Sequence, residues 1–384
     1  MIIGIPKEVI WDVGIEEKRV GLSPAGVKEL TSVGVEVFVE TKAGDGAGFI
    51  DKDYTSAGAK IAYTKEEVFR RADMIVKIAR PVKKETWDFL REEQILLGFL
   101  SLAVAPKDFS QMLIDKKITA IGYEVIETDD LELPILKPMS QIAGNMAVQI
   151  AGRLMENTFK WGMGVLLGGI PGIPPAEVVI IGGGTLGMYA AKAFSGLGAN
   201  VYIVDRNPKK LEHIAHFCYG RITTVLSNKT SLEKLVSFAD VLILCAYIHG
   251  ERAPVLITKQ MVKTMKKGAV LIDFSIDQGG CSETSRLTPE ENYIYQVDGI
   301  THFCVPNVPA WVARTATKAL TNNLLPYVSA IASYGIEEVL KKNPALRKGI
   351  CTFKGQVTHQ YLATDSSPYV DIQTIIGKGK ECSL

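Results

Sequence analysis

Hydrophobic and polar positions alternate in two different ways along the first third of the chain. Short apolar runs (IIGIP, MIVKIA, ILLGFL and AIGYE) are typical of buried strands, and KDFSQMLIDKK has the spacing of an amphipathic helix. Ser23 followed by Pro24 predicts the start of another helix, which Gly34 ends before the strand VEVFVE. Because strands that alternate with helices need crossover connections, the pattern predicts an α/β fold with a parallel sheet.

A second alternating series begins near residue 140. Strands are predicted at VVIIG, NVYIVD, ITTVL, VLILCA and AVLIDFS, with helices around 185–197, 208–217, 231–239 and 258–267. This order is typical of a doubly wound, nucleotide-binding Rossmann domain. A long helical pattern follows residue 312, and the less periodic tail after it is too short to form its own core. We therefore expect the tail to fold back onto the first domain.

Composition and charge favour a small-molecule partner. The 384 residues include 43 basic and 42 acidic side chains, so the formal charge of +1 attracts neither nucleic acid nor an anionic membrane. The six cysteines contain no C-x-x-C pair, which favours reduced thiols in a cytoplasmic protein. No signal peptide is recognisable, and the apolar stretch VLLGGIPGIPPAEVVII is interrupted by three prolines and three glycines. We expect a soluble cytoplasmic protein with no membrane partner.

A glycine-rich turn lies between the first strand and first helix of the second series. Gly182, Gly184 and Gly187 form G-x-G-x-x-G, and Asp205 ends the next strand. Such glycines allow a tight turn and close approach of a pyrophosphate to a helix N-terminus. An acidic residue at the position of Asp205 accepts hydrogen bonds from ribose hydroxyls and repels a 2′-phosphate, so NAD is expected rather than NADP. Adjacent Arg206 keeps NADP possible, and an ordinary strand-to-helix turn is the alternative.

Longer stretches surround this turn with a more specific pattern. The chain resembles the NAD-dependent alanine dehydrogenase family, relatives of the nucleotide domain of transhydrogenases, in IGIPKE, EKRVGLSPAGV, PMSQIAG, GVLLGGIPGIPPAEVVIIGGGTLG, FCYGRI, AVLIDFSIDQGGC, FCVPNVPA, TKALTNNLLPYV and NPALRKGI. The resemblance covers essentially the whole chain. It implies a split, Rossmann-like catalytic domain over 1–135 and 314–384, an inserted NAD-binding Rossmann domain over 136–313, and a homo-oligomer, a hexamer or a dimer.

The resemblance also implies roles for individual residues. Asp277 would lie beside the nicotinamide and take part in the chemistry, and Arg19 would bind the substrate carboxylate. Each residue also has a purely structural alternative. Asp277 could cap a turn, and Arg19 could form a surface ion pair, worth about 0–1 kcal/mol. The adenosine end of NAD would lie against Asp205, Lys210 and Ser227, and the rest against Ser140, Ala246, Tyr247, Ile276, Val305, Asn307 and Val308.

Two family positions are not matched. The family has a lysine two residues after the one matching Lys77, where this chain has Ala79, and a histidine where this chain has Ser101. Losing a positioned acid–base group costs about 10²–10⁴ in rate, roughly 3–5 kcal/mol of barrier. Lys77 is the candidate replacement because strand alternation places it on the face of Ala79, whereas Arg80 points to the opposite face. Ser101 stays a candidate at the histidine position.

The histidines of the second series allow two interpretations each. His302 lies near the predicted cofactor loop and is equally consistent with catalysis and with packing. His213 and His216 have the helical i, i+3 spacing of a metal pair, but no third ligand is nearby. A solvated helix face is therefore favoured for this pair, and no metal is expected.

The expected function is that of an alanine dehydrogenase-like, NAD-dependent oxidoreductase acting on an amino acid or its imine. Short side chains at 79 and 101 leave room in the pocket, which favours a substrate other than alanine or pyruvate. Three alternatives are a genuine alanine dehydrogenase with relocated catalytic groups, a cyclodeaminase-type enzyme that recycles NAD, and a non-catalytic NAD-binding homologue. A transhydrogenase subunit is less favoured because IDQGGC follows the dehydrogenase pattern.

Overall fold

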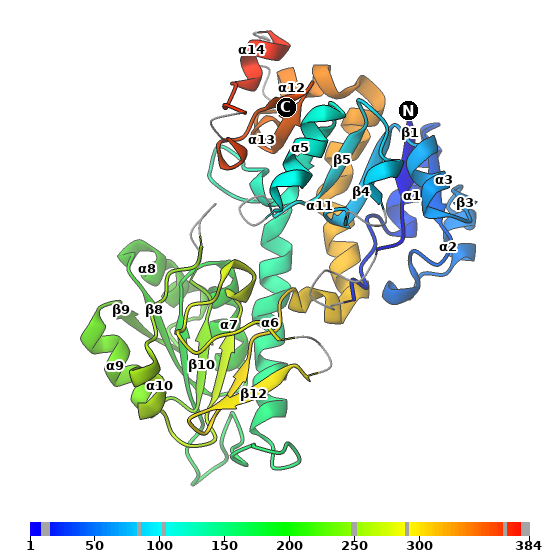
Figure 1. Ribbon diagram of the computed structural model, residues 1–384. Helices are drawn as coiled ribbons and strands as arrows, with labels where there is room; N and C mark the ends of the chain where they lie inside the picture. Colours follow the sequence, from blue (N-terminus) through cyan, green and yellow to red (C-terminus); the bar gives the residue numbers. More distant parts are fainter. Residues whose placement is uncertain are drawn as a thin grey trace. The chain divides into compact units, whose positions relative to one another are not determined.

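The computed structural model describes residues 1–8, 16–82, 86–101, 105–246, 252–288, 292–363 and 367–377. The chain forms two compact units (Figure 1). Unit 1 comprises Met1–Met139 and Ala310–Leu384, and unit 2 comprises Ser140–Pro309. Each unit is built around its own mainly parallel sheet, so the α/β fold class with two Rossmann-like parts is confirmed.

The sheet of unit 1 has eight strands in the order β15-β14-β6-β5-β4-β1-β2-β3. Strands β1 to β6 pair in parallel, and the strand order reverses between β1 and β4, as in doubly wound folds. β14, from the C-terminal tail, pairs antiparallel with β6, so the tail joins the sheet of unit 1 as expected. The strands are β1 (Ile2–Ile5), β2 (Glu36–Glu40), β3 (Lys60–Ala62), β4 (Met74–Ala79), β5 (Ile95–Phe99), β6 (Thr119–Gly122), β14 (Ile350–Phe353) and β15 (Gln356–Val357).

Helices and short 3₁₀ segments connect these strands. α1 begins as predicted, with the Ser23 hydroxyl accepting from the Gly26 amide and Pro24 at its first position. The single long helix expected after residue 312 is two helices, because Gly335 (φ 76°) interrupts it. The helices are α1 (Pro24–Ser32), α2 (Asp51–Ser56), α3 (Lys65–Arg71), α5 (Lys107–Asp115), α11 (Ala313–Tyr334), α12 (Ile336–Lys342), α13 (Pro344–Lys348) and α14 (Ile372–Ile376), and the 3₁₀ segments are η1 (Asp45–Ala47), η2 (Trp87–Phe89), η4 (Tyr123–Val125) and η8 (Gln360–Leu362).

Unit 2 carries a seven-stranded sheet in the order β12-β13-β11-β10-β7-β8-β9. The strands and helices predicted for the second series are present, although α10 ends at Thr264, short of the expected 267. The strands are β7 (Glu177–Ile181), β8 (Asn200–Asp205), β9 (Thr223–Leu226), β10 (Val241–Leu244), β11 (Val270–Asp273), β12 (Ile294–Val297) and β13 (Ile300–Phe303). The helices are α7 (Thr185–Gly196), α8 (Pro208–Phe217), α9 (Lys229–Phe238) and α10 (Lys259–Thr264), with the 3₁₀ segment η5 (Ile276–Gln278). The residue ranges of the long α6 (Leu136–Met155) and the 3₁₀ segment η7 (Val308–Val312) include the two points where the chain passes from one unit to the other.

Two hairpins depart from the all-parallel expectation. β12 and β13 are joined by Asp298 and Gly299 (φ 51° and 79°), and β14 and β15 by Lys354 and Gly355 (φ 49° and 78°). Two consecutive positive φ angles are typical of the tight turn that joins antiparallel strands. Both turns add antiparallel strands at a sheet edge, a signal that the helix–strand alternation alone does not carry.

Continuous apolar strands form the centre of each sheet. Every residue of β4 is buried, as are those of β10 and β11, because helices cover both faces of a doubly wound sheet. In unit 1, Phe109 and Leu113 of α5 pack with Leu96 of β5 in one apolar cluster. In the part of the chain that the structure describes, no helix is both long and apolar enough to cross a bilayer.

Candidate functional site

The glycine turn of unit 2 has the geometry that a dinucleotide requires. A Cβ on Gly187 would lie 1.9 Å from the carbonyl oxygen of Gly182, and Gly182 itself has φ 117°. Gly184 is the N-cap residue of α7, and it has no side chain that could bond to the first amides of the helix. A Cβ at Gly184 would meet nothing within 4 Å. Two of the glycines are therefore needed for packing, whereas the third leaves the helix N-terminus open to an anion such as a pyrophosphate.

The acidic residue at the end of β8 is held by backbone amides. Asp205 Oδ2 accepts from the Gly183 amide at 2.7 Å, and Oδ1 accepts from the Asn207 amide at 2.8 Å. A carboxylate has about four acceptor positions, so ribose hydroxyls can still bind to it. The backbone amide of Ser227 donates to the Asp205 carbonyl at 3.0 Å, and Lys210 lies exposed on α8. This turn and carboxylate fit the ribose and pyrophosphate of NAD.

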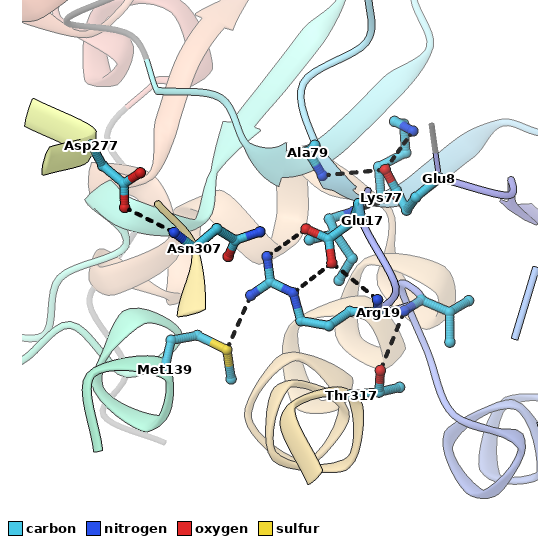
Figure 2. Close-up of polar contacts among 11 residues, drawn as sticks. Glu8, Glu17, Arg19, Lys77, Ala79, Met139, Asp277, Asn307 and Thr317 are labelled. Carbon is cyan, nitrogen blue, oxygen red and sulfur yellow. Dashed lines mark hydrogen bonds and ion pairs between the residues drawn. The ribbon is translucent and has the colours of Figure 1, made fainter. Parts of the chain in front are cut away.

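Most of the residues predicted to lie near the nicotinamide half of NAD stand on loops at the carboxyl ends of β10, β11 and β13. Asp277 is exposed in η5, and its Oδ2 accepts from the Asn307 amide at 3.4 Å (Figure 2). The Ala246 carbonyl accepts from the Ser275 hydroxyl at 2.9 Å. Ser140 is half-buried near the start of α6, and the side chains of Ile276, Val305 and Val308 are buried. Tyr247 lies outside the described residues.

A buried carboxylate that sequence reasoning missed organises the loop carrying Asp277. Asp273, at the end of β11, accepts from the Ser275 and Cys281 amides at 2.9 and 2.7 Å and from the Ser285 hydroxyl at 2.6 Å. Burial raises the pKa of Asp273 despite these hydrogen bonds. The available signal was an acidic residue directly after the apolar run AVLI, at the end of β11. The hydrogen bonds of Asp273 fix the backbone of the loop that carries Asp277.

His302 is buried and both of its ring nitrogens are hydrogen-bonded within unit 2. It is fully buried on β13, its Nδ1–H donates to the Ile300 carbonyl at 3.0 Å, and its Nε2 accepts from the Thr284 hydroxyl at 2.8 Å. The tautomer follows from the carbonyl, which can only accept. The ring stacks on Tyr295 with centroids 5.0 Å apart. Burial lowers the pKa of His302 to about 4, so the imidazole is neutral near pH 7 and the packing interpretation is favoured over the catalytic one.

Arg19 of unit 1 lies in a buried, two-pronged ion pair (Figure 2). Its side chain is 3% exposed, and its Nε and Nη2 donate to Glu17 Oε1 and Oε2 at 2.8 and 2.7 Å. Nη1 donates to Met139 Sδ at 3.4 Å, and the neighbouring Val20 amide donates to Thr317 Oγ1 of α11 at 3.3 Å. The surface-ion-pair alternative for Arg19 is therefore wrong. Glu17 was missed from the sequence, although it stands two residues before Arg19.

Lys77 is also engaged in a buried ion pair. Its Nζ donates to Glu8 Oε2 at 2.8 Å, with both side chains 1% exposed (Figure 2). Glu8 Oε1 further accepts from the Ile78 amide at 2.7 Å. Moving Lys77 to a substrate would leave the Glu8 carboxylate buried without its cation, a change that typically costs about 3–5 kcal/mol. The structure thus opposes Lys77 as the replacement for the missing lysine.

The two positions with short side chains lie at the carboxyl ends of neighbouring strands. Ala79 ends β4 and is 7% exposed, opposite Phe99 of β5, where the register shifts. Ser101 follows β5 in a left-handed conformation (φ 51°), and its amide donates to Glu124 Oε1 at 2.7 Å. Sequence reasoning missed Glu124 as well, although it is the last residue of the predicted strand AIGYE.

Metal ligation finds no support among the residues described here. Within the described ranges, no group of three or more histidine, cysteine or acidic side chains is arranged to hold a metal ion. His213 and His216 are both exposed on α8.

Comparisons with known proteins extend over nearly the whole chain. Two family models match, "Alanine dehydrogenase/PNT, N-terminal domain" over residues 4–143 and "Alanine dehydrogenase/PNT, C-terminal domain" over residues 147–360. The alanine dehydrogenase of Methanococcus maripaludis is 44% identical over 364 residues, which cover 94% of this chain and 96% of the relative. That of Staphylococcus epidermidis is 44% identical over 375 residues, covering 97% and 99%.

A solved structure of an L-alanine dehydrogenase has the same fold. It superposes with a TM-score of 0.88 at 41% identity and covers 94% of this chain and 98% of its own. The chain belongs to the alanine dehydrogenase/PNT family and is accordingly an NAD-dependent oxidoreductase of the amino acid dehydrogenase type.

Proposed function

We propose that this protein uses NAD⁺ to oxidise L-alanine at its α-carbon. Water hydrolyses the resulting imine, so that the products are pyruvate, ammonium, NADH and a proton. The observation that carries this proposal is 44% identity to alanine dehydrogenases over 94–97% of the chain. Similarity of this extent favours alanine over a different amino acid. It therefore supports the alternative of a genuine alanine dehydrogenase with relocated groups better than the expectation of another substrate.

The two units take different parts in this proposal. Unit 2 would bind NAD, with its pyrophosphate at the open N-terminus of α7 beside Gly184 and its ribose at Asp205. When bound, NAD⁺ supplies the hydride acceptor. The remaining cofactor contacts would come from Gly182, Gly187, Lys210, Ser227, Ser140, Ala246, Tyr247, Ile276, Val305, Asn307 and Val308.

Unit 1 would bind the amino acid through Arg19. The Glu17 carboxylate fixes the guanidinium of Arg19 through two hydrogen bonds of 2.7 and 2.8 Å, and both side chains are buried. A fixed, desolvated guanidinium is well suited to bind a carboxylate. We assign proton or water handling to Asp277, whose exposed carboxylate stands on the loop that Asp273 anchors.

One feature favours a second candidate substrate class. Ala79 and Ser101 are much smaller than lysine and histidine, and Lys77 is held by Glu8. A bulkier amino acid, or an imine that already carries its nitrogen, needs less proton transfer from the protein. An imine-reducing or bulky-substrate dehydrogenase is therefore the runner-up.

The deciding experiment follows NADH absorbance with purified protein, NAD⁺ and a panel of amino acids. The panel contains L-alanine, lysine, ornithine and bulky apolar amino acids, with NADP⁺ as the matched cofactor control. We expect alanine to give the highest kcat/KM and NADP⁺ to give little activity, because Asp205 repels a 2′-phosphate. A higher kcat/KM for any other member would replace alanine by the runner-up, and binding of NAD without any turnover would favour a non-catalytic homologue.

Asp277 is tested by the Asp277→Asn variant. The amide keeps the shape and removes the charge, so we expect kcat to fall about 10²–10⁴-fold while NADH binding persists. The matched control is Asp298→Asn in the hairpin between β12 and β13, where asparagine tolerates the positive φ of 51°. Wild-type activity in Asp277→Asn would contradict the assignment.

The assembly and compartment are proposals of the same kind. We propose a homo-oligomer, a hexamer or a dimer, which light scattering coupled to size-exclusion chromatography would distinguish. We also propose a cytoplasmic protein with reduced thiols. Each of the five cysteines among the described residues is buried and outside any disulfide.

A further inference from the structure

The residues that follow β11 form a short closed turn that carries Asp277. The Ser275 carbonyl accepts from the amides of Gln278 and Gly280, at 2.9 and 3.0 Å. Gly279 and Gly280 have φ angles of 102° and 83°, which suit glycine and let the chain reverse within a few residues. Asp277 lies within this turn and is exposed, so its position depends on how the two ends of the turn are held.

One buried carboxylate holds both ends of the turn. Asp273, the last residue of β11, is 1% exposed. Its Oδ1 accepts from the Ser275 amide at 2.9 Å, and its Oδ2 accepts from the Cys281 amide at 2.7 Å. Oδ2 also accepts from the Ser285 hydroxyl at 2.6 Å. The carboxylate of Asp273 is therefore bonded to the chain on both sides of Asp277.

The same two residues also bond to the loop that follows the neighbouring strand β10. The Ala246 carbonyl accepts from the Ser275 hydroxyl at 2.9 Å and from the Cys281 thiol at 3.5 Å. Ser275 and Cys281 thus each bridge Asp273 and Ala246, with the amide donating to one and the side chain to the other. Because β10 and β11 are adjacent parallel strands, the bridges join two loops at the carboxyl-terminal edge of the unit 2 sheet. We call these four residues the loop clasp.

We propose that Asp273 is a positioning residue, which acts through the loop clasp to hold the Asp277 carboxylate at a fixed distance from the loop of Ala246. Since Ala246 is a predicted contact of NAD, the clasp would align Asp277 with the nicotinamide. This inference rests on the proposed function and adds a positioning residue to it. Proton and hydride transfer need close alignment, and a misplacement of about 1 Å can cost about 100-fold in rate.

The first test is the Asp273→Asn variant, in which an NH₂ group replaces one acceptor oxygen and faces an amide donor. We expect kcat for alanine oxidation, referred to the NADH-binding sites found by titration, to fall about 10- to 100-fold. KM for alanine should change less than about threefold, because Arg19 in unit 1 is untouched. Loss of the buried hydrogen bonds should also lower the melting temperature.

The matched control is Asp240→Asn at the other end of the same sheet. Asp240 is also a buried carboxylate, and its Oδ2 accepts from the Glu177 amide at 2.8 Å. It stands directly before β10, whereas Asp273 ends β11. Asp240→Asn should therefore lower the melting temperature but leave kcat at the wild-type value. A similar fall of kcat in both variants would reduce Asp273 to a structural residue.

A double-mutant cycle separates positioning from general destabilisation of the fold. If Asp273 acts through Asp277, adding Asp273→Asn to Asp277→Asn should alter kcat by less than about threefold. Full multiplication of the two losses would overturn the positioning role, as would a wild-type kcat in Asp273→Asn.

Ser275→Ala decides the question if Asp273→Asn does not fold. It removes only the hydrogen bond to the Ala246 carbonyl, so kcat should fall about three- to tenfold. In the Asp277→Asn background the same change should have no effect. A wild-type kcat in Ser275→Ala would contradict the role of the clasp.

Amide hydrogen exchange tests the clasp without substrate or cofactor. Exchange of residues 274–285 should be faster in Asp273→Asn, or in Ser275→Ala if that variant is used, and unchanged in Asp240→Asn. Unchanged exchange in the clasp variant would refute the proposal. The proposed function is judged on wild-type protein alone. If wild type prefers another amino acid of the panel, the variants are compared with that substrate; if it turns over none, the proposed function fails, while exchange still decides whether Asp273 holds the loop of Asp277.

Discussion

The carboxyl-terminal edges of the two sheets differ in how they deviate from the family pattern. In unit 2 the glycine turn, Asp205 and the loop carrying Asp277 match that pattern, and the N-terminus of α7 is open. In unit 1 Arg19 is held by Glu17, whereas Ala79 and Ser101 stand where the resemblance leads us to expect a lysine and a histidine. The difference teaches that the part of the expected site that would bind the cofactor can keep the family pattern while the part that would bind the substrate departs from it.

Restoring the family residues would sharpen this comparison most. In Ala79→Lys/Ser101→His, pyruvate amination should accelerate about 10²–10⁴-fold, roughly 3–5 kcal/mol of barrier, because a positioned cation and an acid–base group return. Histidine is among the residues that tolerate the left-handed backbone of Ser101. Steady-state kinetics would measure the gain, and Ala79→Met/Ser101→Asn controls for side-chain size. No gain would indicate that unit 1 already contains a full substitute.

Breaking the buried Arg19–Glu17 pair of unit 1 should affect stability and activity together. Arg19→Leu leaves Glu17 buried without its cation, so the free energy of unfolding should fall by about 3–5 kcal/mol, and turnover should be lost. Urea denaturation and NADH absorbance are the measurements. In the control, Glu17→Gln/Arg19→Leu, much of the stability should return while activity does not. A stable but inactive Arg19→Leu would contradict the structural part of this prediction.

A pH-dependent contribution to stability should come from unit 2. The pKa of His302 is about 4 in the folded protein and about 6.5 when unfolded, so the unfolded state binds more protons between these values. Stability should therefore rise with pH across this window, and about 3 kcal/mol should be lost between pH 7 and pH 4. In His302→Gln this part of the pH dependence should disappear from denaturation midpoints. An unchanged profile would show that His302 does not titrate in this way.

The smallest expected effects come from alanine substitutions in the glycine turn, where Gly187 and Gly184 should respond differently. Gly187→Ala should destabilise unit 2 by about 1–3 kcal/mol, because its Cβ would lie 1.9 Å from the Gly182 carbonyl. Gly184→Ala should leave the unliganded melting temperature unchanged and weaken NAD binding about tenfold, because its Cβ occupies only open space over the helix N-terminus. Calorimetric titration with NADH, together with thermal denaturation, distinguishes the two. Equal stability losses would contradict the division between packing and cofactor glycines.

Local sequence patterns predicted which segments form helices and strands better than they predicted the antiparallel hairpins and the break in the long C-terminal helix. The start of α1 at Ser23 and Pro24 was predictable because capping depends on adjacent residues alone. The hairpin turns at Asp298–Gly299 and Lys354–Gly355 carry a local signal too, but it is masked when strands are assumed to alternate with helices. The break at Gly335 was missed because the helical periodicity continues on both sides of it.

By itself, the sequence determined the two α/β parts, the glycine turn with Asp205, and the short side chains at 79 and 101, since these follow from short-range periodicity, spacing and residue identity. Only the tertiary structure decided how buried charged side chains are satisfied: Arg19 by Glu17, Lys77 by Glu8, and Asp273 by amides and a hydroxyl of the loop that carries Asp277. It also decided that His302 is buried. Burial and pairing depend on which strands become neighbours in the sheet, and neighbours such as β1 and β4 are distant in the chain.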